Sequence, residues 1–95
     1  MDYYFEWDAR KAATNERKHS VGFDEARTVF YDPLARIFDD VDHSSAEHRE
    51  IIIGRSALNR LLIVSFIERQ KAIRLISARI ATRFERQDYE ENISR

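Results

Sequence analysis

The 95 residues include no cysteine, one proline and two glycines. Without cysteine there are no disulfides, no thiolate catalysis and no cysteine-ligated zinc, which fits a reducing compartment. With so little proline and glycine there is no linker, and we expect residues 1–95 to form a single small domain. No apolar run approaches the roughly 18 residues of a membrane helix, and no signal peptide is evident. We therefore expect a cytosolic protein that does not bind membranes.

The net charge of −1 conceals an asymmetry along the chain. Residues 1–52 carry 7 basic and 12 acidic side chains, whereas residues 53–88 carry 8 basic and 3 acidic ones. Of the 16 basic residues, 13 are arginine, whose planar guanidinium suits bidentate recognition of phosphate or carboxylate. The second half either binds an external anion or neutralises the acidic first half within the fold.

The first third of the sequence predicts a strand followed by helices. Aromatic residues and one glutamate make up Tyr3–Trp7, which is typical of a short strand. Asp8 is a suitable N-cap for a helix that continues to about His19. We expect the alanine side of this helix to pack and the opposite side to stay polar. The polar side carries Lys11, Asn15, Lys18 and His19. A second short helix is expected over residues 23–31, stopped by a proline.

The remainder predicts strands and a last helix. Four segments are rich in β-branched and apolar residues: 34–38, 50–56, 60–68 and 72–78. The short gaps between the last three indicate an antiparallel meander, and the unbroken apolar runs predict central strands covered on both faces. Thr82 and Glu85 match the capping box of a helix that ends near residue 92. We expect an α+β domain of order β-α-α-β-β-β-β-α, with an antiparallel sheet packed by helices.

Arginines crowd the start of this last helix, namely Arg79, Arg83 and Arg86. The helix dipole disfavours positive charge there, so a negative partner is expected. Free amides, the dipole and guanidinium donors together make a phosphate or oxyanion site. The alternative is pairing with Glu85, Asp88 or the acidic segment 39–49. Three strand arginines enlarge the site if they point toward the helix: Arg49, Arg60 and Arg74.

Two segments contain histidine. His19, beside Lys18, is the best-placed proton carrier by residue type, because imidazole titrates near neutrality. The alternative is that both residues cap the helix C-terminus. Segment 39–49 gathers carboxylates and two histidines, but its spacing matches neither a calcium loop nor a known zinc-protease motif. We expect a solvated loop there, with no metal and no other cofactor.

Short motifs follow one another in a fixed order over residues 5–89. They are FEWD at 5–8, Lys11, Asn15, KH at 18–19, FxEA at 23–26, VFYDP at 29–33, DHSSAEHR at 42–49, IGRS at 53–56, RLLIV at 60–64, ISAR at 76–79, and FER at 84–86 ahead of Tyr89. Their order and spacing resemble the BrnT family of bacterial toxins. Ser20 and Asn59 depart from the pattern, because the family usually has glycine at both positions. Asparagine tolerates left-handed backbone better than most residues.

The resemblance implies a RelE-like fold and an endoribonuclease that inhibits translation. From the residues themselves, a basic cluster with groups nearby that can move protons, we expect the cleavage to be metal-independent. The resemblance also implies a DNA-binding, BrnA-like antitoxin as partner. The toxin is expected to contact operator DNA only through this antitoxin. In the expected reaction the RNA 2′-hydroxyl attacks the adjacent phosphate. We expect Arg79 to clamp the phosphorane with help from Lys18, and His19 and Glu85 to move protons. RNA phosphates on either side are expected to contact Arg49, Arg83 and Arg86.

Two other functions remain compatible with the sequence. A basic face could hold the antitoxin or nucleic acid without cleaving it, which requires only charge. A purely structural partner in a larger assembly is the other possibility, indicated by aromatic residues such as Tyr3 and Tyr4. Unlike the ribonuclease, a protein with either of these functions is expected to leave RNA intact.

Overall fold

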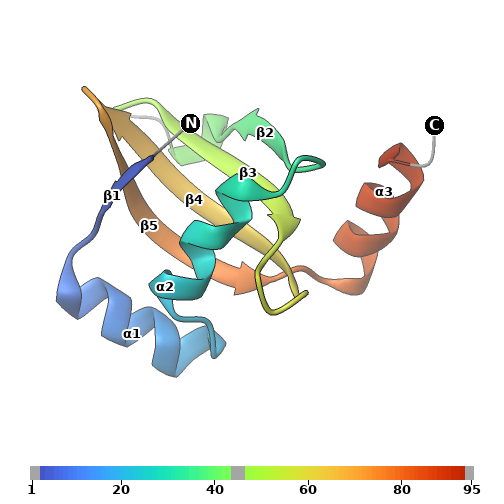
Figure 1. The fold of residues 1–95 in the computed structure, drawn as a ribbon, viewed down its shortest axis with the longest axis horizontal. Helices are drawn as coiled ribbons and strands as arrows, with labels where there is room; N and C mark the ends of the chain where they lie inside the picture. The colour runs from blue at the N-terminus through green and yellow to red at the C-terminus, as the bar shows by residue number, and fades with distance from the viewer. Residues whose placement is uncertain (1–2, 44–46, 94–95) are drawn as a thin grey trace.

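The computed structural model describes residues 3–43 and 47–93, which form a five-stranded sheet flanked by helices (Figure 1). The elements are β1 (Tyr4–Glu6), α1 (Ala9–His19), α2 (Phe23–Ala26), η1 (Arg27–Tyr31), β2 (Arg36–Asp39), η2 (Val41–His43), β3 (Arg49–Arg55), β4 (Leu61–Arg69), β5 (Ala72–Ile80) and α3 (Arg83–Ile93). The α+β class, the single small domain and the order of elements are confirmed. Within these ranges no helix has the length and apolarity needed to span a membrane.

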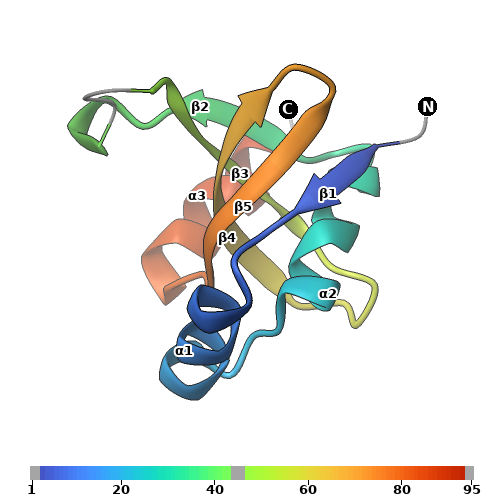
Figure 2. The same cartoon turned by 90° about the vertical axis from the view of Figure 1, so that its left-hand side faces the viewer.

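The strand order across the sheet is β1-β5-β4-β3-β2. Strands β2 to β5 form the predicted antiparallel meander, but β1 pairs with β5 in parallel, from Tyr4 opposite Ala72 to Glu6 opposite Arg74 (Figure 2). The sheet is therefore mixed, and the expectation of a wholly antiparallel sheet is wrong at this edge. No hairpin joins β1 to β5, so nothing in the connection requires an antiparallel direction.

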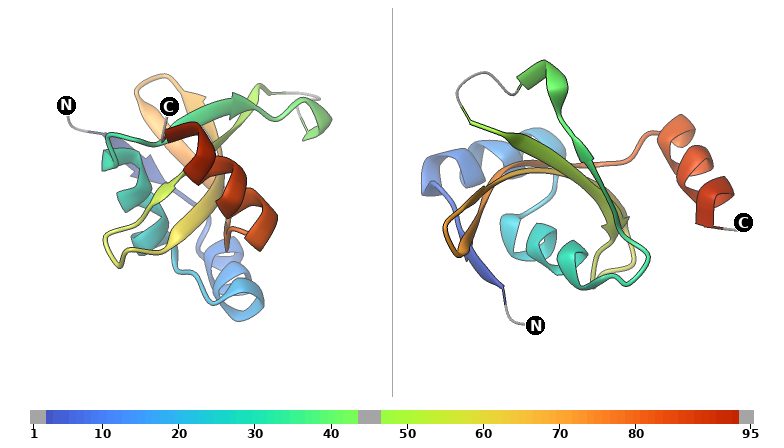
Figure 3. Two further views of the ribbon diagram at one scale, coloured as in Figure 1. Left: turned by 90° about the vertical axis from the view of Figure 1, so that its right-hand side faces the viewer. Right: turned by 90° about the horizontal axis from the view of Figure 1, so that it is seen from above.

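The inner face of the sheet curves around α2 and η1, and α1 lies at the end of β5 (Figure 3). The side chains that fill this face are buried and apolar. They are Val21, Phe23, Ala26, Val29, Phe30, Ile52, Leu62, Val64, Phe66, Ile73, Leu75 and Ala78. Phe30 packs edge-on against Phe66, with ring centroids 5.0 Å apart. This is the main core of the domain.

The outer face carries α3, which leaves the end of β5 and lies on the side opposite η1 (Figure 3). Tyr89 anchors the helix in a smaller core with Ile53, Leu61, Ile63 and Ala81. The Tyr89 hydroxyl donates to the Leu34 carbonyl oxygen at 3.2 Å. Since buried side chains lie on both faces of β3 and β4, the prediction of doubly covered central strands is confirmed.

Asn15 corrects the expectation for α1. Asp8 caps the helix as predicted, but Ala13 is exposed whereas Asn15 is only 6% exposed. The Asn15 amide donates to the carbonyls of Val21 and Ala78 at 3.0 and 2.8 Å, and it accepts from the Ala78 N–H at 3.0 Å. Because β1 pairs only with the first residues of β5, this amide satisfies backbone groups on the open edge. The packed side of α1 therefore combines Asn15 with Ala12, one residue from each predicted side, and the lysines of the predicted polar side stay exposed.

Ser20 and Asn59, which replace glycines of the family pattern, both adopt the positive φ that favours glycine. Ser20 ends α1 with φ 58°, and its N–H donates to the Glu16 carbonyl at 2.9 Å. Asn59 adopts φ 61° in the turn before β4. Both residues are left-handed, so the turns retain their shape without glycine.

An irregularity in β5 decides which face its last residues present. The cross-strand pairs at this point are Ser65 with Ser77 and Phe66 with Leu75. Ile76 is therefore an extra residue in β5, which forms a β-bulge. Leu75 before the bulge and Ala78 after it both belong to the inner core, although three positions separate them. The bulge thus turns Ser77 and Arg79 to the outer face.

Candidate functional site

A depression on the outer face brings together polar residues from four elements. It has a volume of about 410 Å³ and a floor of Ile51 and Ile63. Its other lining residues are Asp40, Asp42, His43, Arg49, Ser65, Ser77 and Arg79. We call this depression the outer-face hollow. Two of the predicted site residues, Arg49 and Arg79, line it.

The strand register explains why these residues meet. Ser65 is the cross-strand partner of both Ile51 and Ser77, and Ile63 pairs with Arg79. Partners on one face of a sheet lie roughly 5 Å apart at Cβ, close enough to share a surface. The hollow is therefore built on strands, which hold their side chains more rigidly than loops.

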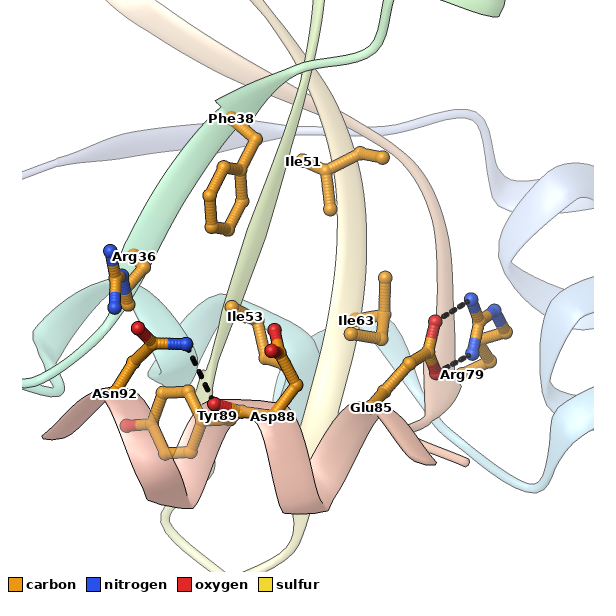
Figure 4. Close-up of a pocket in the computed structure, with 10 residues that line it drawn as sticks. All are labelled: Arg36, Phe38, Ile51, Ile53, Ile63, Arg79, Glu85, Asp88, Tyr89 and Asn92. Atoms are coloured by element: carbon orange, nitrogen blue, oxygen red, sulfur yellow. Dashed lines mark hydrogen bonds and ion pairs between the residues drawn. The ribbon is translucent and has the colours of Figure 1, made fainter. Parts of the chain in front are cut away.

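Arg79 binds Glu85 of α3 in a bidentate ion pair (Figure 4). Its Nη1 lies 2.7 Å from Oε1 and its Nη2 lies 2.8 Å from Oε2. The Arg79 guanidinium holds the pKa of Glu85 well below its usual 4.5, at about 2. The carboxylate in turn raises the pKa of Arg79. Glu85 is therefore ionised at neutral pH, which suits it poorly to the proton-transfer role predicted for it.

Glu85 also forms, with Thr82, the capping box that the sequence predicted at the start of α3. Its Oε1 accepts from the Thr82 N–H at 2.8 Å, and its own N–H donates to Thr82 Oγ1 at 3.1 Å. The negative group required at this helix start is thus a residue of the chain itself. The predicted open anion pocket is filled, and a phosphate that binds Arg79 through its Nη atoms must displace Glu85.

Arg60, which precedes β4, and Arg74 of β5 are paired away from the hollow. Arg60 binds Glu25 through Nε at 2.9 Å and through Nη2, and Nη2 also donates to the Ser20 carbonyl at 3.0 Å. Arg74 binds Glu6 at 3.0 Å. Neither residue enlarges the site, so internal neutralisation of the basic half is the correct account for both.

Arg83 and Arg86 lie on α3 outside the stripe of the helix that faces the sheet. That stripe consists of Glu85, Asp88, Tyr89 and Asn92. Arg83 is exposed and Arg86 half-buried, and neither forms an ion pair within the described residues. Both guanidinium groups are therefore available to an external anion.

Lys18 and His19 are not brought into the outer-face hollow. Lys18 is exposed and His19 half-buried in the last turn of α1. Among the described residues neither side chain makes a hydrogen bond or an ion pair. Their place in the last turn agrees with the alternative role of offsetting the negative end of the helix dipole.

A second depression, of about 290 Å³, lies between α3 and the sheet (Figure 4). It is lined by Arg36, Phe38, Ile51, Ile53, Ile63, Arg79, Glu85, Asp88, Tyr89 and Asn92. Ile51, Ile63 and Arg79 also line the outer-face hollow. The Arg79–Glu85 ion pair therefore stands between the two depressions, and it holds α3 at their boundary.

His43 and Asp40 are site residues that the sequence did not reveal. His43 Nδ1 lies 3.1 Å from both carboxylate oxygens of Asp40. The spacing D-x-x-H was a signal that both side chains share one turn. Nothing in the sequence places that turn beside Arg49 and Arg79, and the sequence predicts only a solvated loop for the segment. Residues 44–46 of that segment lie outside the described residues.

The described residues include one group with the chemistry of metal ligands. Donor atoms of Asp39, His48 and Glu50 lie within 4.8 Å of one another. Asp39 and His48 are exposed and form an ion pair at 2.9 Å. Exposed groups of this kind are common without an ion, so the geometry does not indicate a metal centre.

Comparison with known proteins places the chain among the ribonuclease toxins of type II toxin–antitoxin systems. A family model described as "Ribonuclease toxin, BrnT, of type II toxin-antitoxin system" matches residues 7–85. The chain belongs to the BrnT family, and this family implies an antitoxin partner.

A solved structure agrees with the assignment. The crystal structure of the Brucella abortus ribonuclease toxin BrnT superimposes with a TM-score of 0.66 at 25% sequence identity. The match covers 86% of this chain and 100% of that chain. Among curated proteins there is no match.

Proposed function

We propose that the chain is a metal-independent endoribonuclease that cuts RNA at the outer-face hollow and so inhibits translation. Residues 1–95 form one toxin domain, and a cognate DNA-binding antitoxin neutralises it and carries it to operator DNA. The observation that supports the proposal is that Arg49 and Arg79 line one hollow in a BrnT-family chain. Guanidinium groups there can bind a phosphodiester and stabilise the charge that develops on phosphorus.

In this proposal Arg79 is the phosphorane clamp and Arg49 holds an adjacent phosphate. The Nε–H of Arg79 has no hydrogen-bond partner among the described residues, whereas both Nη atoms bind Glu85. An incoming phosphate can use Nε first and then exchange with the carboxylate. Arg83 and Arg86 contact RNA phosphates further along the strand.

The proton transfers need a group within the hollow. Glu85 is ionised and engaged with Arg79. Lys18 and His19 line no part of the hollow, so we assign them no role at the scissile phosphate.

The test is an RNA cleavage assay in excess chelator, with DNA of the same sequence as substrate control. An Arg49→Ala preparation controls for contaminating nucleases. We expect RNA fragments with 2′,3′-cyclic phosphate and 5′-hydroxyl ends, because the 2′-hydroxyl is the nucleophile, and we expect intact DNA. Cleavage only after a divalent metal is added, or cleavage of DNA, would contradict the mechanism.

A second function is favoured by the closed ion pair at Arg79. With its Nη atoms held by Glu85, and with Arg60 and Arg74 also paired, the chain can serve as a module that binds an antitoxin or nucleic acid without cutting it. That module leaves RNA intact in the same assay. Its expression alone does not arrest growth.

A further inference from the structure

We propose that His43 is the general base of RNA cleavage and that Asp40 is the residue that positions it. The inference rests on the proposed ribonuclease function. It assigns the proton transfer to a residue of η2 that lines the outer-face hollow beside both arginines. No other histidine of the chain lines that hollow.

The orientation of the imidazole follows from its hydrogen bonds. Nδ1 of His43 lies 3.1 Å from each carboxylate oxygen of Asp40. A carboxylate only accepts hydrogen bonds, so Nδ1 carries the proton and Nε2 keeps its lone pair. Nε2 makes no hydrogen bond within the described residues and is available to a ligand. This is the tautomer that a general base needs.

The turn that holds the two side chains is fixed to β3. The Asp40 N–H donates to the Arg49 carbonyl at 2.8 Å, which continues the β2–β3 ladder by one residue. The His43 N–H donates to the Asp40 carbonyl at 3.2 Å. His43 is therefore tied, through Asp40, to the strand residue that carries one of the arginines.

Asp40 is nearly buried and His43 is exposed, as expected for a general base that a fixed carboxylate holds in place. The Asp40 side chain is 11% exposed, whereas that of His43 is 65% exposed. A carboxylate so nearly buried must be satisfied by donors, and the imidazole supplies one of them. The carboxylate is thus held in place, while the ring reaches solvent and substrate.

Four charged residues line the hollow together with His43. Asp40 and Asp42 belong to its own turn, Arg49 comes from β3 and Arg79 from β5. The carboxylates favour the imidazolium that forms when the base takes a proton. The arginines favour the dianionic phosphorane that develops as O2′ bonds to phosphorus, so both charges that develop in this step have opposite charges nearby.

The step balances with water as the only co-reactant. His43 Nε2 takes the proton of the RNA 2′-hydroxyl while O2′ forms a bond to phosphorus. The bond from phosphorus to O5′ breaks, O5′ takes a proton from water, and a 2′,3′-cyclic phosphate remains. The imidazolium then loses its proton to solvent, and Asp40 accepts a hydrogen bond from Nδ1 throughout.

The other two histidines lie in different settings and provide comparisons. His48 pairs with Asp39, which precedes Asp40 in the strand and so points to the opposite face of the sheet. His19 ends α1 and lines no part of the hollow. A sequence-based choice falls on His19, so the same experiment compares it with His43.

The experiment measures RNA cleavage by the full chain in chelator for His43→Gln, His48→Gln and His19→Gln. We expect a loss of about 100-fold or more for His43→Gln, which is typical for removal of a general base, and less than threefold for the matched control His48→Gln. A large loss for His19→Gln together with an active His43→Gln protein would overturn the assignment. Circular dichroism checks that each variant is folded.

Two further variants separate proton transfer from structural support. His43→Gly should regain activity when imidazole is added, which no folding defect explains. Asp40→Asn should lower kcat and leave the KM for RNA unchanged, because Asp40 orients the base and does not contact the substrate. A His43→Gly protein that added imidazole does not rescue, or an Asp40→Asn protein with wild-type kcat, would count against the proposal.

The outcomes distinguish this inference from the function on which it rests. If the wild-type chain does not cut RNA, the proposed function fails. If the wild-type chain cuts RNA and His43→Gln cuts it within threefold of the same rate, the function stands and the assignment of His43 is wrong.

Discussion

The inner and outer faces of the sheet use alternate residues of the same strands for different purposes. On the inner face, Phe66 and Leu75 are about 1% exposed and pack against helices. On the outer face, Ser65, Ser77 and Arg79 are half-buried and line a hollow. The inner face therefore supplies most of the stability, and the outer face can carry polar groups because α3 covers only part of it.

The bulge at Ile76 is what keeps these two roles apart in β5. With strict alternation from Leu75, residue 79 would face the inner core, where a guanidinium has no place. The extra residue shifts the alternation of side chains between the two faces by one position. Ala78 therefore packs in the inner core, and Arg79 points to the outer face, where it binds Glu85. A single-residue irregularity thus places the main candidate cation on the open face.

The largest contrast between the faces is expected from neighbouring residues of β4. Phe66→Ala should lower the free energy of unfolding by about 3–5 kcal/mol, because a buried aromatic ring is removed from the inner core. Ser65→Ala, one residue earlier on the outer face, should change it by less than about 1 kcal/mol. Urea denaturation of both variants measures the difference. Equal losses would contradict the division between the faces.

Gly54 offers a second contrast at the inner face. A Cβ at this position would lie 2.9 Å from Ala35 Cβ and 3.0 Å from Val29 Cγ1. Gly54→Ala should therefore cost about 1–3 kcal/mol by overpacking. The matched control is Gly22→Ala, whose Cβ would meet only the flexible Glu16 side chain, at 3.4 Å, and should cost less than about 1 kcal/mol. Thermal unfolding that ranks these two variants in reverse order would refute the packing argument.

A smaller effect is expected where α3 is tethered to the outer face. Glu85→Gln should lower the free energy of unfolding by about 1 kcal/mol at pH 7, through loss of the partly exposed ion pair with Arg79, since glutamine can still complete the capping box with Thr82. Because the pKa of Glu85 falls from 4.5 to about 2 on folding, its charge stabilises the fold fully above pH 4.5. That contribution is lost as the pH falls toward 2.

Urea denaturation of wild type and Glu85→Gln at several pH values tests this linkage. The difference between the two proteins should shrink between pH 4.5 and pH 2. The control is the same pair of proteins with Arg79→Gln added to both, which removes the main cause of the low pKa of Glu85 and should reduce the narrowing. A difference that stays constant over this range would show that the charge of Glu85 does not act through Arg79.

The smallest effects belong to the left-handed turns. Ser20→Gly should stabilise the chain by about 0.5–1 kcal/mol, because serine is strained at φ 58° and glycine is not. Asn59→Gly should change stability by less than about 0.5 kcal/mol, since asparagine tolerates this conformation. The midpoints of urea unfolding of the two variants and the wild type measure these changes in stability. A Ser20→Gly variant less stable than wild type would show that the strain is absent.

The sequence predicted most of the fold because local signals agreed with one another. The caps Asp8 and Thr82 mark helix starts correctly, and the apolar runs of β3 and β4 indicate strands covered on both faces. The sequence could not show contacts between residues that are far apart in the chain. Asn15 looks solvated on a helical wheel, yet it bonds to the open edge of β5, 63 residues away.

The site was only partly predictable for the same reason. Arg49 and Arg79 were identified by residue type, and the register of β3, β4 and β5 brings them to one hollow. Residue type and the KH motif at 18–19 favour Lys18 and His19, but neither residue lines the hollow. His43 joins the hollow through the bulge in β5 and the backbone bond from Asp40 to Arg49, which leave no pattern in the sequence.

The central claim is that the outer face carries the ribonuclease chemistry through Arg79. The most direct test is the RNA cleavage rate, in chelator, of folded Arg79→Ala protein against Arg74→Ala, a matched arginine of β5 that pairs with Glu6 outside the hollow. We predict a loss of about 100- to 1,000-fold for Arg79→Ala and less than threefold for Arg74→Ala. A folded Arg79→Ala protein that cuts RNA at the wild-type rate would contradict the account.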